Sequence, residues 1–345
     1  MRNFHHIFPL IAVLLISSCN SDDSISPDQL AQDSVIVAWL DTLNISANKT
    51  GNGIYYFAET TNPTGTAVTQ AGSVLAFYFS LMDLDSNQIA SHQPANGDSM
   101  LYKYASNAIF PVGIDEAIGV MREGEVYNFI IPTNLAYQDA PSISTSDGTG
   151  IVLLQINLVG IFSEAQTNQI ELDQIDDFIF SNNLNDTVQV TIDRIDTTFL
   201  GTQILTIDTT FRYDIDSVEY FGSGVRYKEI TPGTGNAPQN GDTLEINYSV
   251  EYLDGTQVFS QSNFLYELGS GIPDFLIPGF EFGLGLMPPL EEAIIMIPSA
   301  QAYRESARIV PSFITPELID AQIIPEYVAR VEPYKPLVFR VTRIQ

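Results

Sequence analysis

The sequence predicts an α+β chain built from two tandem copies of one unit, and three observations support this prediction. Identical residues recur at constant spacing along the chain, so its two halves align with each other. Residues 243–250 and 253–259 alternate apolar and polar side chains around Asp254-Gly255, as expected for a strand, a turn and a second strand. Each copy also begins with a stretch whose apolar residues have helical spacing.

The repeat has an offset of 169 positions in the first part of each copy and 166 positions in the second part. Two constant offsets are not expected by chance, and their difference indicates one insertion or deletion of three residues. Gly72, Leu75, Ser80, Asp85, Gln88, Ser91, Gly113, Gly119, Met121, Ile131, Pro132, Ala136 and Tyr137 recur as Gly241, Leu244, Ser249, Asp254, Gln257, Ser260, Gly279, Gly285, Met287, Ile297, Pro298, Ala302 and Tyr303.

The two candidate helices begin near Asp33 and at Ile170. We expect each helix to pack on its own unit, which makes Trp39 a core residue; a helix that docks onto a partner is the alternative. The residues that share one face are Ile36, Trp39, Leu40 and Leu43 in the first copy and Ile175, Phe178 and Ile179 in the second.

The first eighteen residues have the features of a secretory signal, with Arg2, an apolar run over 7–16, and small residues before Cys19. The apolar run is shorter than the ~18–20 residues that span a bilayer. Cys19 is the only cysteine, and residues 16–19 resemble a bacterial lipobox, which implies a lipid anchor on Cys19. A cleavable signal with an incidental cysteine is the alternative. We therefore expect a signal at 1–18, an acidic tether at 19–29, and anchoring in the cell envelope, at the outer membrane.

Composition excludes several classes of function. The formal net charge of −28 repels nucleic acid. A lone cysteine permits no internal disulfide, and His92 is the one histidine beyond the signal. Ser-His-Asp catalysis and histidine-based zinc sites are therefore not expected, and the chain has no phosphate-binding G-x-x-x-x-G-K loop. We expect no metal and no cofactor.

The second copy resembles the FKBP-type peptidyl-prolyl isomerases. The resemblance rests on the strand pair around Asp254-Gly255, the glycine-rich apolar stretch 277–287, the apolar strand 293–298 and Ala302-Tyr303. It covers most of residues 50–160 and 222–345. It implies two FKBP-like domains, at 30–164 and 165–345, each a twisted antiparallel sheet wrapped around a short helix.

The second copy also contains an insertion at 185–215. Ile195-Asp196-Thr197-Thr198-Phe199 recurs at 207–211, and the alternation of β-branched and polar residues predicts a long hairpin. Its aspartates could bind calcium, but the sequence lacks a D-x-D-x-D-G loop, so we expect a solvated strand face.

The resemblance also implies a pocket in the second copy. It assigns catalytic roles to Tyr303, Tyr248 and Phe259, with the hydroxyl of Tyr303 holding a substrate carbonyl. Two positions depart from the family: Ser260 replaces an aspartate, and Phe280 replaces the tryptophan of the pocket floor. The same aromatic residues could instead form only the core of a sheet-on-helix domain. The implied substrate-binding residues are Leu276, Ile277, Phe280 and Phe339.

The first copy keeps little of this pocket. Among the aromatic positions only Tyr137 remains, so we expect a scaffold that has lost its site. The long loop after Tyr303, which reaches Pro336, is expected to overhang the pocket of the second copy. The replaced pocket positions of the first copy are Phe79, Ala90, Ser91, Ile114 and Leu154.

These observations predict a membrane-anchored peptidyl-prolyl isomerase or folding factor for exported proteins, with its activity in the second copy. The chain resembles FKBP-type lipoproteins of the Bacteroidetes, some of them associated with gliding motility. The predicted partners are peptides with X-Pro bonds, and the membrane through Cys19. The alternative is a non-catalytic envelope module that binds or scaffolds a partner with the same grooves.

Overall fold

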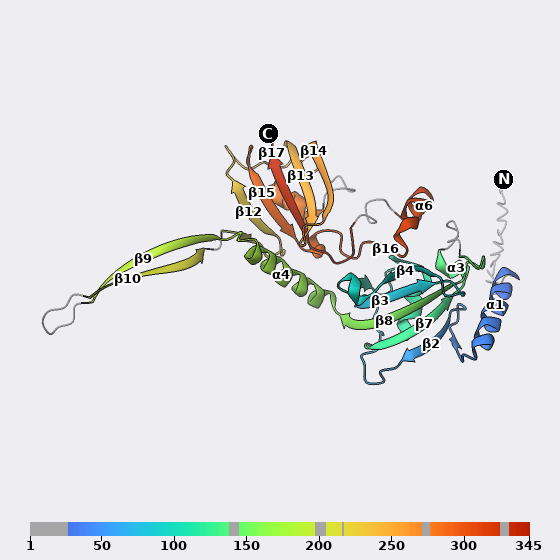
Figure 1. The fold of residues 1–345 in the computed structure, drawn as a ribbon. Helices are drawn as coiled ribbons and strands as arrows, with labels where there is room; N and C mark the ends of the chain where they lie inside the picture. The colour runs from blue at the N-terminus through green and yellow to red at the C-terminus, as the bar shows by residue number, and fades with distance from the viewer. Residues whose placement is uncertain (1–26, 138–144, 197–204, 216, 271–276, 325–330) are drawn as a thin grey trace, which may run out of the picture.

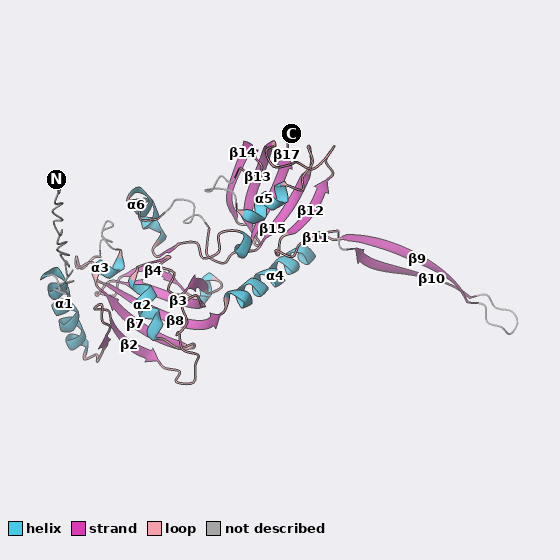
Figure 2. Ribbon diagram, turned by 180° about the vertical axis from the view of Figure 1, so that it is seen from behind, coloured by secondary structure: helices cyan, strands magenta, loops and turns pink. Residues whose placement is uncertain are grey.

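The computed structural model describes residues 27–137, 145–196, 205–215, 217–270, 277–324 and 331–345, and its fold is α+β, as predicted. Two antiparallel sheets lie side by side and are joined by a long helix (Figures 1 and 2). We call residues 30–164 the first unit and residues 165–345 the second unit. Among the described residues, no helix is long and apolar enough to cross a membrane, and no cluster of histidine, cysteine and carboxylate side chains could hold a metal ion.

The sheet of the first unit is antiparallel throughout, and β5 extends it by pairing with β3 beside β4. Two short helices, α2 (Gly113–Ala117) and α3 (Thr133–Ala136), lie at its inner face with 3-10 turns at 94–96 and 118–120. The strand order is β1 (Asn48–Lys49), β2 (Tyr55–Thr60), β7 (Glu125–Ile131), β8 (Val152–Phe162), β3 (Val74–Met82) and β4 (Gln88–His92), with β5 at Met100–Lys103.

The sheet of the second unit has the same order of equivalent strands, and α5 (Pro278–Leu284) lies in its concave face (Figure 2). A 3-10 turn follows at 299–301. The strand order is β11 (Glu219–Tyr220), β12 (Arg226–Thr231), β15 (Glu292–Ile297), β17 (Leu337–Arg343), β13 (Thr243–Tyr252) and β14 (Gln257–Glu267).

Equivalent glycines let a helix approach a strand closely in both units. A Cβ atom on Gly113 would lie 2.9 Å from Cγ2 of Ile131, and one on Gly279 would lie 2.4 Å from Cγ2 of Ile297. Both glycines and both isoleucines belong to the repeat with an offset of 166 positions. The repeat in sequence thus corresponds to a repeated packing contact.

Each sheet carries a longer helix on its outer face, so each predicted helix packs on a sheet of its own chain. α1 (Pro27–Leu43) buries Ile36 and Leu40, and the indole N–H of Trp39 donates to the carbonyl of Leu84 at 2.8 Å. Two expectations are corrected. α1 begins inside the stretch assigned to the tether, and Leu43, in its last turn, is 51% exposed instead of packed.

α4 (Glu164–Ser181) joins the two units and begins six residues earlier than predicted. Ser163 caps it, because its hydroxyl accepts from the backbone N–H of Gln166 at 3.2 Å. Ile175 and Ile179 are buried against the outer face of the second sheet.

The predicted hairpin is present. β9 (Asp186–Asp196) pairs antiparallel with β10 (Leu205–Ile215) along the full length of both strands. The hairpin points away from both sheets (Figure 1). Its position leaves the concave face of the second sheet uncovered by the insertion.

The loop after Tyr303 takes a different course from the one expected. Its strand β16 (Arg308–Ile309) pairs in parallel with β6 (Ile109–Phe110) of the first unit, and a 3-10 turn at 312–314 and helix α6 (Thr315–Asp320) follow. Its described part therefore packs against the first unit, and Ile323 and Ile324 also line a cavity beside Tyr303. The Phe110–Pro111 and Val310–Pro311 peptide bonds are cis.

Candidate functional site

Three aromatic rings from three elements form the floor of the site in the second unit. Phe280 of α5 stacks on Phe339 of β17 with ring centroids 4.3 Å apart. Tyr248 of β13 lies 5.2 Å from Phe280 and 6.4 Å from Phe339, measured between centroids. All three side chains are buried. The structure thus brings together these three predicted site residues, which come from distant parts of the sequence.

Strand periodicity explains this convergence. Side chains alternate between the faces of a strand, so Tyr248 and Val250 share a face, and Val250 is paired with Phe339 on the neighbouring strand. α5 is held close to the sheet because Gly283 has no side chain: a Cβ there would lie 2.4 Å from Cδ1 of Ile295. This close approach places Phe280 over the strands.

Two further phenylalanines border the floor and are only partly buried. Phe259 meets Tyr248 edge-on at 6.1 Å and 88°, and Phe264 meets it at 5.8 Å and 70°. Phe259 was predicted for the site, whereas Phe264 was missed. Phe264 reaches the inner face because the β13–β14 register shifts between Ile246 and Tyr248, and the sequence pattern does not reveal that shift.

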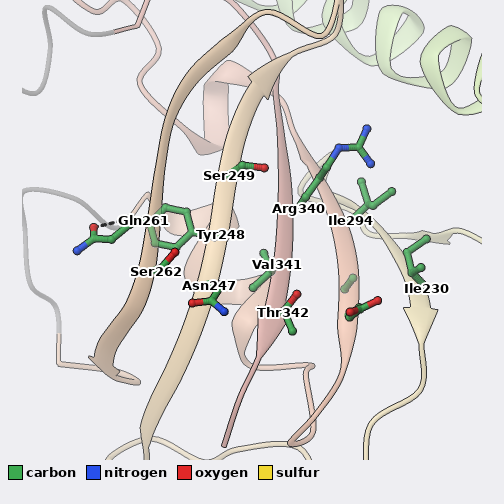
Figure 3. Close-up of a pocket in the computed structure, with 12 residues that line it drawn as sticks. Ile230, Asn247, Tyr248, Ser249, Gln261, Ser262, Ile294, Arg340, Val341 and Thr342 are labelled. Carbon is green, nitrogen blue, oxygen red and sulfur yellow. Dashed lines mark hydrogen bonds between the residues drawn. The ribbon is translucent and has the colours of Figure 1, made fainter.

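The same register determines which residue of β14 faces Tyr248. Ser260 pairs with Ser249, and the adjacent Gln261 pairs with Tyr248. The Tyr248 hydroxyl donates to Oε1 of Gln261 at 3.3 Å, as the dashed line in Figure 3 shows. The group that faces the tyrosine is therefore a neutral amide from the next residue along the chain. It can accept a hydrogen bond, but it adds no charge to the site.

Tyr303 lies where the second unit meets the first. Its side chain is half-buried, packs against the core of the second unit, and lines a cavity of about 400 Å³. Ile323 of the long loop and Phe110 of the first unit also line this cavity, so Tyr303 faces the boundary between the units. Ile277 is buried at the start of α5, and Leu276 lies outside the described residues.

The carboxylate of Glu281 holds α5 against the end of β14 through two hydrogen bonds. Oε1 of Glu281 accepts from the Tyr266 hydroxyl at 2.7 Å and from the backbone N–H of Gly269 at 2.9 Å. Burial, together with the hydrogen bond to Glu281, raises the pKa of Tyr266 above its ordinary value. Tyr266 therefore stays a neutral donor, and its bond to Glu281 ties β14 to the helix that carries Phe280.

A second hollow lies on the outer face of the same sheet. It has a volume of about 500 Å³ and is bordered by Ser249, Ile294 and Arg340 (Figure 3). Ile294 also packs with α4 on that face, whereas its neighbour Ile295 belongs to the core with Phe280. The hollow is thus on the opposite side of the sheet from the aromatic floor.

The first unit has a related arrangement without the aromatic floor. Phe79, Ile114 and Leu154 are buried in one cluster at the positions of Tyr248, Phe280 and Phe339. Tyr137 is buried beside them, and its hydroxyl donates to the backbone carbonyl of Val310 at 2.5 Å. A segment of the second unit thus contacts this tyrosine.

The geometry of the second unit suits the binding of an apolar group more than bond-breaking chemistry. The stacked rings of Phe280 and Phe339 form an apolar centre with Tyr248, and Tyr303 packs against the same core. No nucleophile is needed for a change in the twist of an amide bond. The arrangement can therefore act by differential binding of a twisted amide.

Comparison with known proteins identifies the family of this segment. Residues 234–343 match the model of the FKBP-type peptidyl-prolyl cis-trans isomerases. The probable FKBP-type peptidyl-prolyl cis-trans isomerase FkpA of Neisseria meningitidis is 35% identical over 94 residues, which make up 26% of this chain and 33% of that protein. The chain thus matches only about a third of the length of this curated relative.

Solved structures also resemble the chain. FkpA from Escherichia coli shares 22% identity with a TM-score of 0.29, covering 37% of this chain and 51% of that one. The three FKBP domains of wheat FKBP73 share 12% identity with a TM-score of 0.28, covering 87% of this chain and 98% of that one. The family match spans β13, β14, α5, β15 and β17, which carry the aromatic site. Residues 234–343, which carry the aromatic site, are thus similar in sequence to the FKBP-type peptidyl-prolyl cis-trans isomerases.

Proposed function

We propose that the second unit is a peptidyl-prolyl cis-trans isomerase that acts on exported proteins. The observation that supports this proposal is the cluster of Tyr248, Phe280 and Phe339, in a core against which Tyr303 packs, inside a segment that matches the isomerase family. Peptides with X-Pro bonds are the substrates that this chemistry would recognise.

The reaction requires rotation about one amide bond. Resonance holds the X-Pro amide planar, with a barrier near ~20 kcal/mol. A twisted amide loses part of its delocalised dipole and is less strongly hydrated than the planar form, so an apolar floor binds it preferentially. The Tyr303 hydroxyl would donate to the neighbouring carbonyl and fix the orientation of the substrate. Each 1.36 kcal/mol of preference for the twisted form raises the rate by about tenfold.

Measuring cis–trans exchange in a short peptide with one X-Pro bond tests the proposal. We expect the full chain to accelerate exchange, and the double variant Phe259→Ala/Tyr303→Phe to lose most of that acceleration. Circular dichroism must show that the variant is folded. Exchange at the uncatalysed rate with the folded parent chain would disprove the isomerase function.

A non-catalytic binding module is the second candidate, and one observation favours it. The family has an aspartate where this chain has Ser260, and the residue that faces Tyr248 is the neutral Gln261. A peptide that binds the folded chain, with exchange remaining at the uncatalysed rate, would establish this function.

We also propose that the chain is a lipoprotein of the cell envelope, anchored at the outer membrane. The support is the lone Cys19 after an apolar leader with a lipobox-like sequence; these residues lie outside the described part of the structure. We expect the parent to partition with membranes and Cys19→Ala to be released. A variant that remains in the membrane fraction with an unchanged mass would contradict the anchor.

A further inference from the structure

The first unit binds an extended segment of the second unit along the edge of β6. The backbone N–H of Arg308 donates to the carbonyl of Ala108 at 2.8 Å, and the N–H of Val310 donates to that of Phe110 at 3.1 Å. β16 and β6 therefore pair in register as short parallel strands. Adding a strand in this way is a recurrent mode of peptide recognition, because backbone hydrogen bonds align the ligand while its side chains enter pockets.

A side-chain hydroxyl completes this backbone recognition. The Tyr137 hydroxyl donates to the carbonyl oxygen of Val310 at 2.5 Å, and the tyrosine is only 3% exposed. Burial raises the pKa of Tyr137 above its ordinary value, so the hydroxyl remains a donor. The carbonyl that it holds belongs to the residue directly before Pro311, which is itself buried. The first unit thus holds a Val-Pro step by a donor and an apolar surface.

Apolar side chains of the segment fill the core of the first unit. Ile314 is 3% exposed, whereas the adjacent Phe313 is 65% exposed. The segment buries the side chains on the face that it turns toward the first unit, and not simply its largest apolar residue, because Phe313 points to solvent. The side chains that join the cluster of the first unit are those of Ile309, Val310, Ile314, Leu318 and Ile324.

Charged residues border both ends of the docked strand. Nζ of Lys103 lies 3.6 Å from Oε1 of Glu305, and the guanidinium of Arg308 lies 3.0 Å from Oε1 of Glu332. These pairs are partly exposed and contribute little stability on their own. The buried side chains, the two backbone hydrogen bonds and the hydrogen bond from Tyr137 hold the segment.

We propose that the groove of the first unit around Tyr137 is a peptide-binding site, and that residues 308–324 of the same chain are its resident ligand. The ligand class is an extended apolar peptide in which a β-branched residue precedes proline. In the intact chain the tethered segment competes with any outside peptide, so the site becomes available only when the segment leaves. The proposal does not depend on catalysis by the second unit.

Tethering explains why an outside peptide would compete poorly. A segment on the same chain has an effective concentration on the order of millimolar, so a free peptide with the same sequence must exceed that concentration to displace it. A change that weakens docking of the segment should therefore increase the apparent affinity for the free peptide. The ratio of the two affinities measures how fully the segment occupies the site.

The test uses the full chain and a fluorescently labelled synthetic peptide of residues 306–324, with binding followed by fluorescence anisotropy. Ile314→Asp places a charge at a buried contact, and Phe313→Asp places the same charge on the neighbouring exposed residue. We expect Ile314→Asp to bind the peptide at least about tenfold more tightly than the parent chain. We expect Phe313→Asp to behave like the parent chain.

A second pair of variants locates the bound peptide. In the Ile314→Asp chain, Tyr137→Phe should weaken peptide binding by about twofold to tenfold, as expected for the loss of one neutral hydrogen bond. Tyr78→Phe removes an exposed hydroxyl of the first unit outside the groove and should leave the affinity unchanged. Weakening by Tyr303→Phe and not by Tyr137→Phe would place the peptide on the second unit and overturn the proposal.

The fold of each variant must be checked by circular dichroism. If Ile314→Asp does not fold, the pair Ile309→Ala/Ile314→Ala weakens the same contacts without burying a charge, and the same increase in affinity is expected. A folded variant of either kind that binds the peptide no more tightly than the parent would refute the proposal.

Discussion

The hydroxyl of Tyr137 donates a hydrogen bond to the carbonyl oxygen of Val310, which lies 173 positions further along the chain. Tyr303, the counterpart of Tyr137 in the repeat, is instead half-buried and faces a cavity of about 400 Å³. Two copies of one tyrosine therefore have different environments: one holds a segment of its own chain, and the other lines a cavity at the boundary between the units. This difference agrees with our proposal that isomerase activity belongs to the second unit.

The first prediction concerns Tyr303. Tyr303→Phe should slow catalysed exchange of an X-Pro peptide by about twofold to tenfold, because one neutral hydrogen bond is worth about 0.5–1.5 kcal/mol. Tyr78→Phe is a matched control, since it removes a hydroxyl that donates to Gly97 in the first unit. Equal rates for Tyr303→Phe and the control would show that the Tyr303 hydroxyl takes no part in catalysis.

Phe259 should matter more than Tyr303. Phe259→Ala removes an aromatic side chain that packs edge-on against Tyr248, and apolar contacts of this size contribute about 1.5–3 kcal/mol. We expect the rate of catalysed exchange to fall by roughly tenfold or more. Phe180→Ala serves as the control because Phe180 is 78% exposed on α4. If Phe180→Ala slowed exchange more than Phe259→Ala, the activity would not depend on this aromatic cluster.

The close approach of α5 to the sheet predicts the outcome of a small substitution. Gly283→Ala should lower the free energy of unfolding by about 1–3 kcal/mol, because its Cβ would lie 2.4 Å from Cδ1 of Ile295. Gly222→Ala has open space around its Cβ position and should change stability by less than about 0.5 kcal/mol. Urea denaturation measures both. Equal midpoints for the two variants would contradict the tight packing of α5.

A buried carboxylate on α4 predicts a dependence of stability on pH. Glu171 accepts from the backbone N–H and the hydroxyl of Ser299, both at 2.6 Å, and is almost fully buried. Burial raises its pKa above the ordinary value of 4.5, although the hydrogen bonds from Ser299 oppose this effect. The folded chain therefore holds this proton more tightly than the unfolded chain does. The contribution of Glu171 to the free energy of unfolding is complete below pH 4.5. It is lost as the pH rises through the pKa that Glu171 has in the folded chain.

Glu171→Gln removes this titration and is the matched test. Above pH 4.5 the parent chain should lose free energy of unfolding relative to the variant, by at most about 1.4 kcal/mol per pH unit. Urea denaturation between pH 4.5 and pH 8 measures the difference. A difference that stays constant over this range would show that Glu171 does not titrate with folding.

Much of the architecture follows from local sequence. Gly113 and Gly279 recur at a fixed offset because each must let a short helix approach an isoleucine of the neighbouring strand. Alternation along β13 and β17 is enough to place Tyr248 and Phe339 on one face of a sheet. The hairpin of β9 and β10 follows from β-branched alternation on either side of a turn. In each case the signal lies within one element or its neighbour.

Local patterns could not predict features that depend on long-range pairing. The neighbour of Tyr248 is Gln261 and not Ser260, because a register shift between β13 and β14 reassigns the faces, and register depends on the two strands together. The destination of the loop after Tyr303 depends on which apolar surface is available to cover it. By itself, the sequence determined two related sheets with an aromatic floor in the second. Only the tertiary structure decided that Val310 would dock on Tyr137, because burial of Ile309, Ile314 and Leu318 requires a core supplied by the other unit.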